Sequence, residues 1–256
     1  MQINPLPALT GWHWVKDGFR LLRRQPIALL ALTFMNLFLL SLSVLIPLVG
    51  SVAPLVLTPA LMVGLMHAVR SADRGQTPTP GMLFSAFRDN GGRAIRPLLL
   101  LGGFNAAVTV LALTLSAMAD DGTLMRVATG QIGADDPALE EASLMRPALV
   151  FLVLYTPVQM AMWYAPLFIA WNDVPVKRAL FYSFVGVLRN KRVFLVYAVS
   201  WLAIGLAAAI FVRLMQGMLG GSPMLLSAVM SPLSLVLLTA VYCSFWPTYR
   251  DAVVGD

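Results

Sequence analysis

Residues that could carry acid–base, redox or metal chemistry are few and widely spaced in this sequence. The 256 residues include two histidines, His13 and His67, and one cysteine, Cys243. A metal site needs several converging ligands, and nothing in the spacing brings these side chains together. A single cysteine cannot form an intramolecular disulfide, and neither a nucleophile elbow nor a phosphate-binding glycine loop is present. We therefore predict no catalytic residue, no metal and no cofactor, and we do not expect an enzyme.

A second group of reactive side chains is acidic and lies between residues 119 and 146. The spacing of its carboxylates does not match a 12-residue calcium loop with a central glycine. We expect a solvated, flexible loop, with cation capture as the alternative. The acidic residues of this loop are Asp120, Asp121, Asp135, Asp136, Glu140 and Glu141.

A third group is basic and is clustered beside apolar segments. Guanidinium and ammonium groups at a membrane surface attract anionic lipid headgroups. We therefore predict that anionic membrane lipids are partners, that a protein partner can share this surface, and that nucleic acid is not a partner. The candidate headgroup-binding residues, called here the basic collar, are Arg20, Arg23, Arg24, Lys191 and Arg192.

Three amides fall inside apolar segments, where a polar side chain needs a hydrogen-bonding partner. They are Asn36, Asn105 and Gln159. An interhelical hydrogen bond in a membrane contributes about 0.5–2 kcal/mol. We expect these amides to fix helix packing, and the alternative is that they line a polar path. No Asp, Glu, Lys or Arg lies near the middle of an apolar segment, which disfavours an ion-coupled carrier.

The elements that must position these side chains are six long apolar segments. Hydrophobic residues make up 59% of the chain and charged residues 12%, far from the composition of a soluble protein. A helix of about 20 residues crosses the hydrocarbon core, and a bilayer requires helices or a closed barrel. We predict an all-α polytopic membrane bundle in one domain, residues 1–256. The predicted spans are 27–46, 48–69, 97–118, 147–170, 194–212 and 224–246.

The loops between these spans differ sharply in positive charge. Of the 18 Lys and Arg residues, all but Arg126, Arg146 and Arg213 fall on one side of the predicted topology. Cytoplasmic loops carry the excess of Lys and Arg. We therefore predict a multi-pass membrane protein with both termini in the cytoplasm and the acidic loop outside. This arrangement also explains the net charge of +6.

The spans are organised as three helical hairpins, each preceded by a basic amphipathic segment. In the first segment Trp12, Val15, Phe19 and Leu22 form an apolar stripe. The second segment begins at Pro80 and is expected to break at Gly91 and Gly92. The third begins at Pro175 and carries a stripe of Leu180, Phe181, Phe184 and Leu188. We expect all three segments to lie in the membrane interface on the cytoplasmic side.

Prolines and small residues mark the helices themselves. Prolines recur in the second, fourth and sixth spans, where we expect kinks that shape the bundle, with a gating hinge as the alternative. Small residues predict places where helices approach closely, within one chain or between two. These small residues are Gly102, Gly103, Gly205, Ala207–Ala209, Gly217, Gly220 and Gly221.

Four motifs resemble a family of uncharacterised bacterial six-span inner-membrane proteins. They are GWHWVKDGFRLLRRQP at Gly11–Pro26, TPALMVGLMHA at Thr58–Ala68, YAPLFIAWNDVPVKRALFYSF at Tyr164–Phe184, and YRD at Tyr249–Asp251. The hairpin repeat is more distantly similar to the membrane domain attached to some glycerophosphodiester phosphodiesterases, whose catalytic domain this sequence lacks. The resemblance implies a fold and a location, and it brings no catalytic residues.

From the sequence we predict a non-enzymatic inner-membrane protein that interacts with lipids or with a partner through the basic collar. The alternative is a passive or weakly coupled transporter of a small or amphipathic substrate, with a path lined by Asn36, Asn105 and Gln159. The sequence identifies no substrate.

Overall fold

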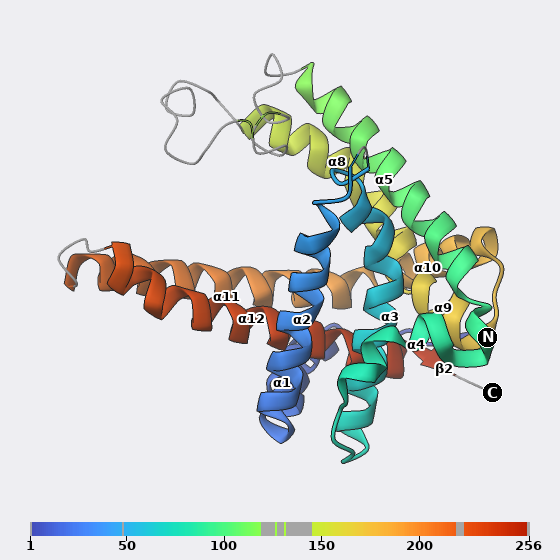
Figure 1. Ribbon diagram of the computed structural model, residues 1–256, viewed down its shortest axis with the longest axis horizontal. Coiled ribbons are helices and arrows are strands. Elements are labelled where there is room, and N and C mark those ends of the chain that lie inside the picture. Colours follow the sequence, from blue (N-terminus) through green and yellow to red (C-terminus); the bar gives the residue numbers. More distant parts are fainter. Residues whose placement is uncertain are drawn as a thin grey trace. The chain divides into compact units, whose positions relative to one another are not determined.

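The computed structural model describes residues 2–47, 49–118, 126, 131, 145–218 and 223–254, and these residues are almost entirely α-helical (Figure 1). Among these described residues, six helical stretches are long and apolar enough to cross a membrane. The prediction of an all-α polytopic protein is confirmed. The stretches are α2 (Pro26–Ser43), α3 (Ala53–Asp73), α5 (Ile95–Ala117), α8 with α9 (Met145–Asn172), α11 (Lys191–Met218) and α12 (Pro223–Ala252).

Helix ends differ from the predicted ones mainly where proline intervenes. Helix α2 ends at Ser43 and α3 begins at Ala53, so the predicted bounds at residues 46 and 48 lie in the connection. Pro47 disfavours helical geometry at the residue before it, whereas Pro54 is tolerated in a first helical turn. Helix α12 continues through Pro247 to Ala252, beyond the predicted end at residue 246.

The chain forms two compact units. The first comprises Met1–Leu39, Leu61–Arg88 and Gly186–Asp256, and the second comprises Leu40–Ala60 and Asp89–Val185. Each unit is described by itself below. The prediction of one domain concerns how the units assemble, and it stays a prediction.

In the first unit, α1 (Thr10–Arg24) packs against both α11 and α12, which themselves run side by side (Figure 1). Two glycines make this contact possible. A Cβ atom on Gly11 would overlap the carbonyl oxygen of Val193, and one on Gly18 would lie 2.6 Å from Cβ of Ser244. Backbone cannot move aside as a flexible side chain can, so α1 needs glycine at these positions to approach its neighbours.

The buried face of α1 differs from the predicted apolar stripe. Trp14 is fully buried, with its ring edge-on to Phe194 and Tyr197. Of the stripe, Val15 and Leu22 are buried. Trp12, in contrast, is 42% exposed. The tightly packed face follows the small residues, because small side chains let helices come close.

The N-terminal segment is joined to the end of the chain. Strand β1 (Gln2–Ile3) pairs antiparallel with β2 (Val253–Val254). The buried Asn190, between α10 and α11, also holds the N-terminal segment. Its Oδ1 accepts a hydrogen bond from Leu6 N at 2.9 Å, and its Nδ2 donates to Asn4 O at 3.0 Å.

In the second unit, α5 packs along α8 (Met145–Met162), as Figure 1 shows for these two neighbouring helices. The helical path then breaks at Trp163 and Tyr164 before α9 (Ala165–Asn172). The buried hydroxyl of Ser183 joins the two sides of the break, since it accepts from Tyr164 N and donates to Met160 O, each at 2.8 Å. One side chain thus satisfies a donor and an acceptor that the break leaves outside the helical ladder.

The other two predicted amphipathic segments also form helices. The second is divided into η1 (Pro80–Phe84), α4 (Ser85–Arg88) and η2 (Asp89–Gly92), and Gly91 has a positive φ of 67°, so the expected break is confirmed. The third is α10 (Val176–Arg189). Small residues Ala179 and Ser183 are buried on α10, whereas Phe181 is 63% exposed.

Candidate functional site

Charged and aromatic residues of α1 and of the C-terminal turns of α3 and α12 gather into one cluster within the first unit. We call it the aspartate–arginine–tryptophan cluster. Its three carboxylates come from three different helices, and each has a cation or an indole N–H beside it. Its members are Asp17, Asp73, Asp251, Arg24, Arg250, Trp14 and Trp246.

Arg250 is the centre of this cluster. Its Nε lies 2.8 Å from Oδ1 of Asp251, its Nη2 lies 3.1 Å from Oδ2 of Asp17, and its Nη1 lies 3.4 Å from Oδ2 of Asp73. The planar guanidinium offers five N–H donors in a fixed geometry, which lets a single side chain contact several carboxylates. Arg250 therefore connects the end of α12 with both α1 and α3.

Two buried tryptophans donate hydrogen bonds to the carboxylates of the cluster. Trp14 Nε1 donates to Oδ2 of Asp251 at 3.0 Å, and Trp246 Nε1 donates to Oδ2 of Asp73 at the same distance. A hydrogen bond to a charged group contributes about 1.5–3 kcal/mol, more than the roughly 0.2–1 kcal/mol of an exposed ion pair. The indole–carboxylate bonds are therefore the stronger links, and the ion pairs add to them.

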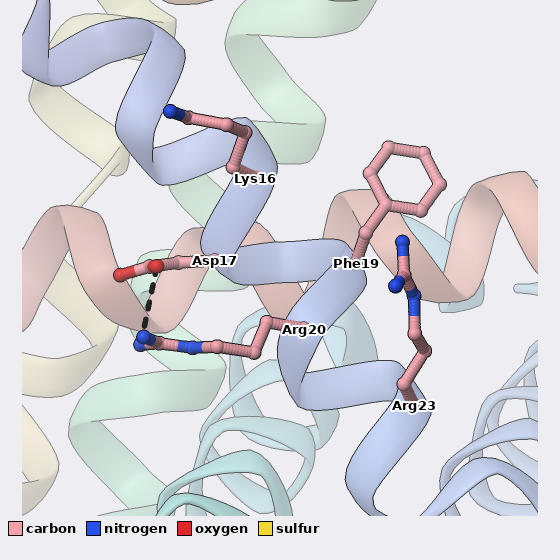
Figure 2. A pocket seen from close by; sticks show the side chains of 5 residues that line it. All are labelled: Lys16, Asp17, Phe19, Arg20 and Arg23. Carbon is pink, nitrogen blue, oxygen red and sulfur yellow. Dashed lines mark ion pairs between the residues drawn. The ribbon is translucent and has the colours of Figure 1, made fainter.

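A basic hollow of about 520 Å³ lies beside α1, and its residues are drawn in Figure 2. Lys16, Arg20 and Arg23 supply three cations, Asp17 supplies one carboxylate, and Phe19 supplies an apolar wall. Arg20 Nη2 lies 3.1 Å from Oδ1 of Asp17, the ion pair marked in Figure 2.

Within the predicted collar, the five cations differ in their partners. Arg20 pairs with Asp17, and Arg24 donates to the backbone oxygen of Asp73 at 2.9 Å and to its Oδ1 at 3.2 Å. The other three collar residues, Arg23, Lys191 and Arg192, are exposed, and no carboxylate among the described residues pairs with them. The predicted role in headgroup binding therefore applies best to these three, and it stays a prediction.

The three predicted intramembrane amides occupy different surroundings. In the second unit, Asn105 Oδ1 accepts a hydrogen bond from the Tyr155 hydroxyl at 2.9 Å, which ties α5 to α8, whereas Gln159 is exposed on α8. In the first unit, Asn36 is 3% exposed, and its Oδ1 accepts no hydrogen bond from a described residue. Within the second unit, no described hydrogen bond joins Asn105 to Gln159.

No pattern in the sequence predicted the aspartate–arginine–tryptophan cluster. Asp17 and Trp14 do lie in the first recognised motif, and Arg250 and Asp251 lie in the terminal YRD motif. A usable signal was the position of Asp73 and Asp251 at the ends of apolar helices, where an acid needs a cation or a hydrogen-bond donor. The acidic loop residues between 119 and 144 lie outside the described residues. Within the described parts, no cluster of His, Cys, Asp and Glu is suited to a metal ion.

The chain has a curated relative over nearly its whole length. A protein of Burkholderia thailandensis named a probable inner membrane protein is 38% identical over 253 residues, which cover 98% of this chain and 93% of the relative. No protein-family model matches the chain. No solved structure matches it either. These comparisons do not support the more distant resemblance to membrane domains of glycerophosphodiester phosphodiesterases.

Proposed function

Since this chain belongs to the family of the probable inner membrane protein of Burkholderia thailandensis, we propose that it is a non-enzymatic protein whose basic surface binds anionic lipid headgroups. The inner-membrane location follows from that family and from the six apolar helices. The headgroup role rests on one observation above all. Exposed cations at Arg23, Lys191 and Arg192 have no carboxylate partner within the described residues.

Exposed aromatic residues on the basic helices support the same proposal. Trp12 lies on α1, where Lys16 Nζ is 6.0 Å from its ring, and Tyr182 lies on α10, which carries Lys177 and Arg178; both rings are partly exposed. Tryptophan and tyrosine are enriched where a membrane meets water, because their rings are apolar and their N–H or O–H groups are polar. Cations and interfacial aromatics on the same helices favour contact with a charged membrane surface.

The proposal requires these helices to face the cytoplasm, where the leaflet is anionic. The charge difference between the loops supports that orientation. Reporter fusions that fluoresce only in the cytoplasm, placed after Asp256 and within the acidic loop, test it. A cytoplasmic C-terminus and an external acidic loop are expected. The reverse pattern would refute the orientation.

A charge-matched comparison tests lipid binding itself. One triple variant carries Arg23→Gln, Lys191→Gln and Arg192→Gln; its control carries glutamine at the three basic residues of the opposite predicted side, Arg126, Arg146 and Arg213. Both proteins are placed in phosphatidylcholine nanodiscs with a minor fraction of phosphatidylglycerol, and retained lipids are counted by native mass spectrometry.

The first variant is expected to retain less phosphatidylglycerol than the control, because each basic residue near an anionic surface contributes about 1 kcal/mol of attraction. Equal retention of phosphatidylglycerol by the two variants and the unchanged protein would refute the proposal. The glutamine side chains keep similar size, so the comparison isolates charge.

A passive transporter remains the alternative, and one observation favours it. Oδ1 of the buried Asn36 has no hydrogen-bond donor within the described residues, and a buried polar atom without a partner is costly in lipid. If Asn36 binds a substrate, native spectra of the unchanged protein should show a bound non-lipid molecule that Asn36→Leu loses. Identical spectra for the two proteins would remove this support.

A further inference from the structure

We propose that the basic hollow on α1 is a binding site for a single phosphate group, supplied by an anionic lipid headgroup or by a soluble phosphate compound. This inference rests on the proposed headgroup-binding function and assigns it to one place. It involves residues outside the collar, Lys16 and Phe19, and a carboxylate that the collar does not contain, Asp17.

The charge of the hollow matches a phosphate. Three cations, Lys16, Arg20 and Arg23, and one carboxylate, Asp17, line the hollow, so the lining carries an excess of two positive charges. A phosphodiester carries one negative charge and a phosphomonoester carries about 1.5–2 at neutral pH. Arg20 is already paired with Asp17, so the uncompensated cations are Lys16 and Arg23. An anion of one to two charges would balance the hollow.

The geometry of α1 brings these cations together. Lys16, Arg20 and Arg23 are spaced at i, i+4 and i+7, and residues at this spacing share one face of a helix. In Figure 2 these side chains extend from successive turns of α1, Lys16 and Arg20 on the side of Asp17 and Arg23 beside Phe19. The guanidinium of Arg23 can donate two parallel N–H bonds to phosphate oxygens, and the ammonium of Lys16 can act as a second point charge.

The hollow is built on a fixed helix. Helix α1 is held at Gly18 by close contact with α12, and the fully buried Trp14 bonds to Asp251. Asp17 is itself held by Arg250, so the carboxylate that orients Arg20 has a second anchor. A site whose side chains are already positioned loses less entropy when a ligand binds.

Phe19 gives the hollow an apolar side. Its ring lies 5.7 Å from the ring of Trp201 on α11, so it is packed between two helices and still lines the hollow. A lipid phosphate is covalently joined to a glycerol and acyl chains, whereas inorganic phosphate is not. The apolar wall therefore favours the lipid as the source of the phosphate.

Lys191 and Arg192 provide a matched control on the same unit. They also carry two exposed charges, but they are successive residues at the start of α11, and residues at i and i+1 do not face each other on a helix. They contribute general attraction to an anionic surface without forming a site. A localised site and a diffuse basic surface therefore predict different results for the two pairs.

The experiment compares two double variants of the whole protein in phosphatidylcholine nanodiscs titrated with phosphatidylglycerol. Lys16→Gln with Arg23→Gln removes the uncompensated cations of the hollow; Lys191→Gln with Arg192→Gln removes the same charge elsewhere. The hollow variant is expected to bind its first phosphatidylglycerol at least about tenfold more weakly than the control, because both variants lose the general attraction of two cations and only the hollow variant also loses charge-assisted hydrogen bonds to the phosphate. A double variant with Arg23→Lys in place of Arg23→Gln should bind more tightly than the hollow variant and more weakly than the unchanged protein, because lysine keeps the charge and lacks the planar guanidinium.

Equal losses in the two double variants would overturn the hollow as a site and leave the broader lipid-binding function standing. Unchanged binding in both would overturn the two together. Melting temperatures in pure phosphatidylcholine nanodiscs must match the unchanged protein, since the substituted side chains are exposed. If the hollow variant melts early, Arg23→Lys replaces it and Arg192→Lys is its control, since each keeps the charge and loses the planar guanidinium. A weaker first-lipid affinity for Arg23→Lys than for Arg192→Lys supports the site, and equal affinities refute it.

Inorganic phosphate in the absence of anionic lipid distinguishes the two sources of the ligand. Stabilisation of the unchanged protein by phosphate, lost in the hollow variant, supports a site open to soluble phosphate compounds. Stabilisation by phosphatidylglycerol alone supports a lipid site that needs the apolar wall at Phe19. If phosphate stabilises both variants equally and phosphatidylglycerol binds both equally, the hollow is not the site.

Discussion

Two adjacent glycines in α5 allow a direct test of how the second unit is packed. Gly102 faces the start of α3 in the same unit, where a Cβ atom would overlap the carbonyl oxygen of Val56 and lie 2.7 Å from its Cα. Gly103, one residue later, has open space around it. The variants Gly102→Ala and Gly103→Ala therefore add the same methyl group to the same helix. At Gly102 the methyl group meets the backbone of Val56, and at Gly103 it meets open space.

The expected magnitude follows from two opposing effects. Alanine stabilises a helix interior relative to glycine by about 1 kcal/mol, and this gain applies to both variants. Overpacking costs about 1–3 kcal/mol, and it applies only at Gly102 because the facing atoms are backbone. The gain in helix propensity cancels when the free energies of unfolding of the two variants are subtracted, so the difference between them is the packing cost. Gly103→Ala should be neutral or stabilising, and Gly102→Ala should be the less stable by about 1–3 kcal/mol.

Thermal unfolding in a mild detergent, followed by the loss of helical circular dichroism, measures this difference. For a chain of this size, 1 kcal/mol corresponds to about 2–4 °C, so the two melting temperatures should differ by roughly 2–12 °C. Equal melting temperatures, or a less stable Gly103→Ala, would refute the close contact between α5 and the start of α3.

Three further substitutions test single contacts, each measured by the same thermal unfolding. Trp14→Phe should cost about 2–4 kcal/mol, because it removes the hydrogen bond to Asp251 and part of a buried ring. Ser183→Ala should cost about 1–3 kcal/mol, because a buried donor and acceptor at the break after α8 lose their partner. Tyr155→Phe should cost about 0.5–2 kcal/mol, because the buried Asn105 loses its interhelical bond.

Each of these substitutions has a control that makes the same chemical change at a residue without the tested contact. Trp12→Phe alters an exposed tryptophan of α1, Ser200→Ala removes a hydroxyl that bonds only within its own helix turn, and Tyr182→Phe alters an exposed tyrosine. These controls should shift stability by less than about 0.5 kcal/mol. A control as costly as its partner would show that the contact itself does not carry the stability.

The apolar spans could be predicted from the sequence because one physical requirement decides them. A helix that crosses a bilayer needs about 20 residues without charge, and hydropathy shows such stretches directly. The helix ends were harder, since Pro47 ends α2 early while Pro247 stays inside α12. Proline restricts the backbone in both cases, and only the neighbouring packing decides whether the helix continues.

The aspartate–arginine–tryptophan cluster could not be predicted in the same way. Its bonds join residues 237 positions apart for Trp14 and Asp251, and 173 apart for Trp246 and Asp73. No local period relates such positions. The buried face of α1 was missed for a similar reason, because the sequence pattern shows bulky residues whereas close packing depends on Gly11 and Gly18.

The attachment of the chain's beginning to its end has a consequence for synthesis. Trp14 leaves the ribosome 237 residues before Asp251, its hydrogen-bond partner. At about 5–20 residues per second, that separation corresponds to a wait of roughly 10–50 s. Until Lys191 is made, α1 has neither α11 nor α12 to cover its small-residue face. Helix α1 is therefore assembled long after it is made, and a nascent protein must shelter it, at the membrane surface or by a chaperone, until α11 and α12 have been made.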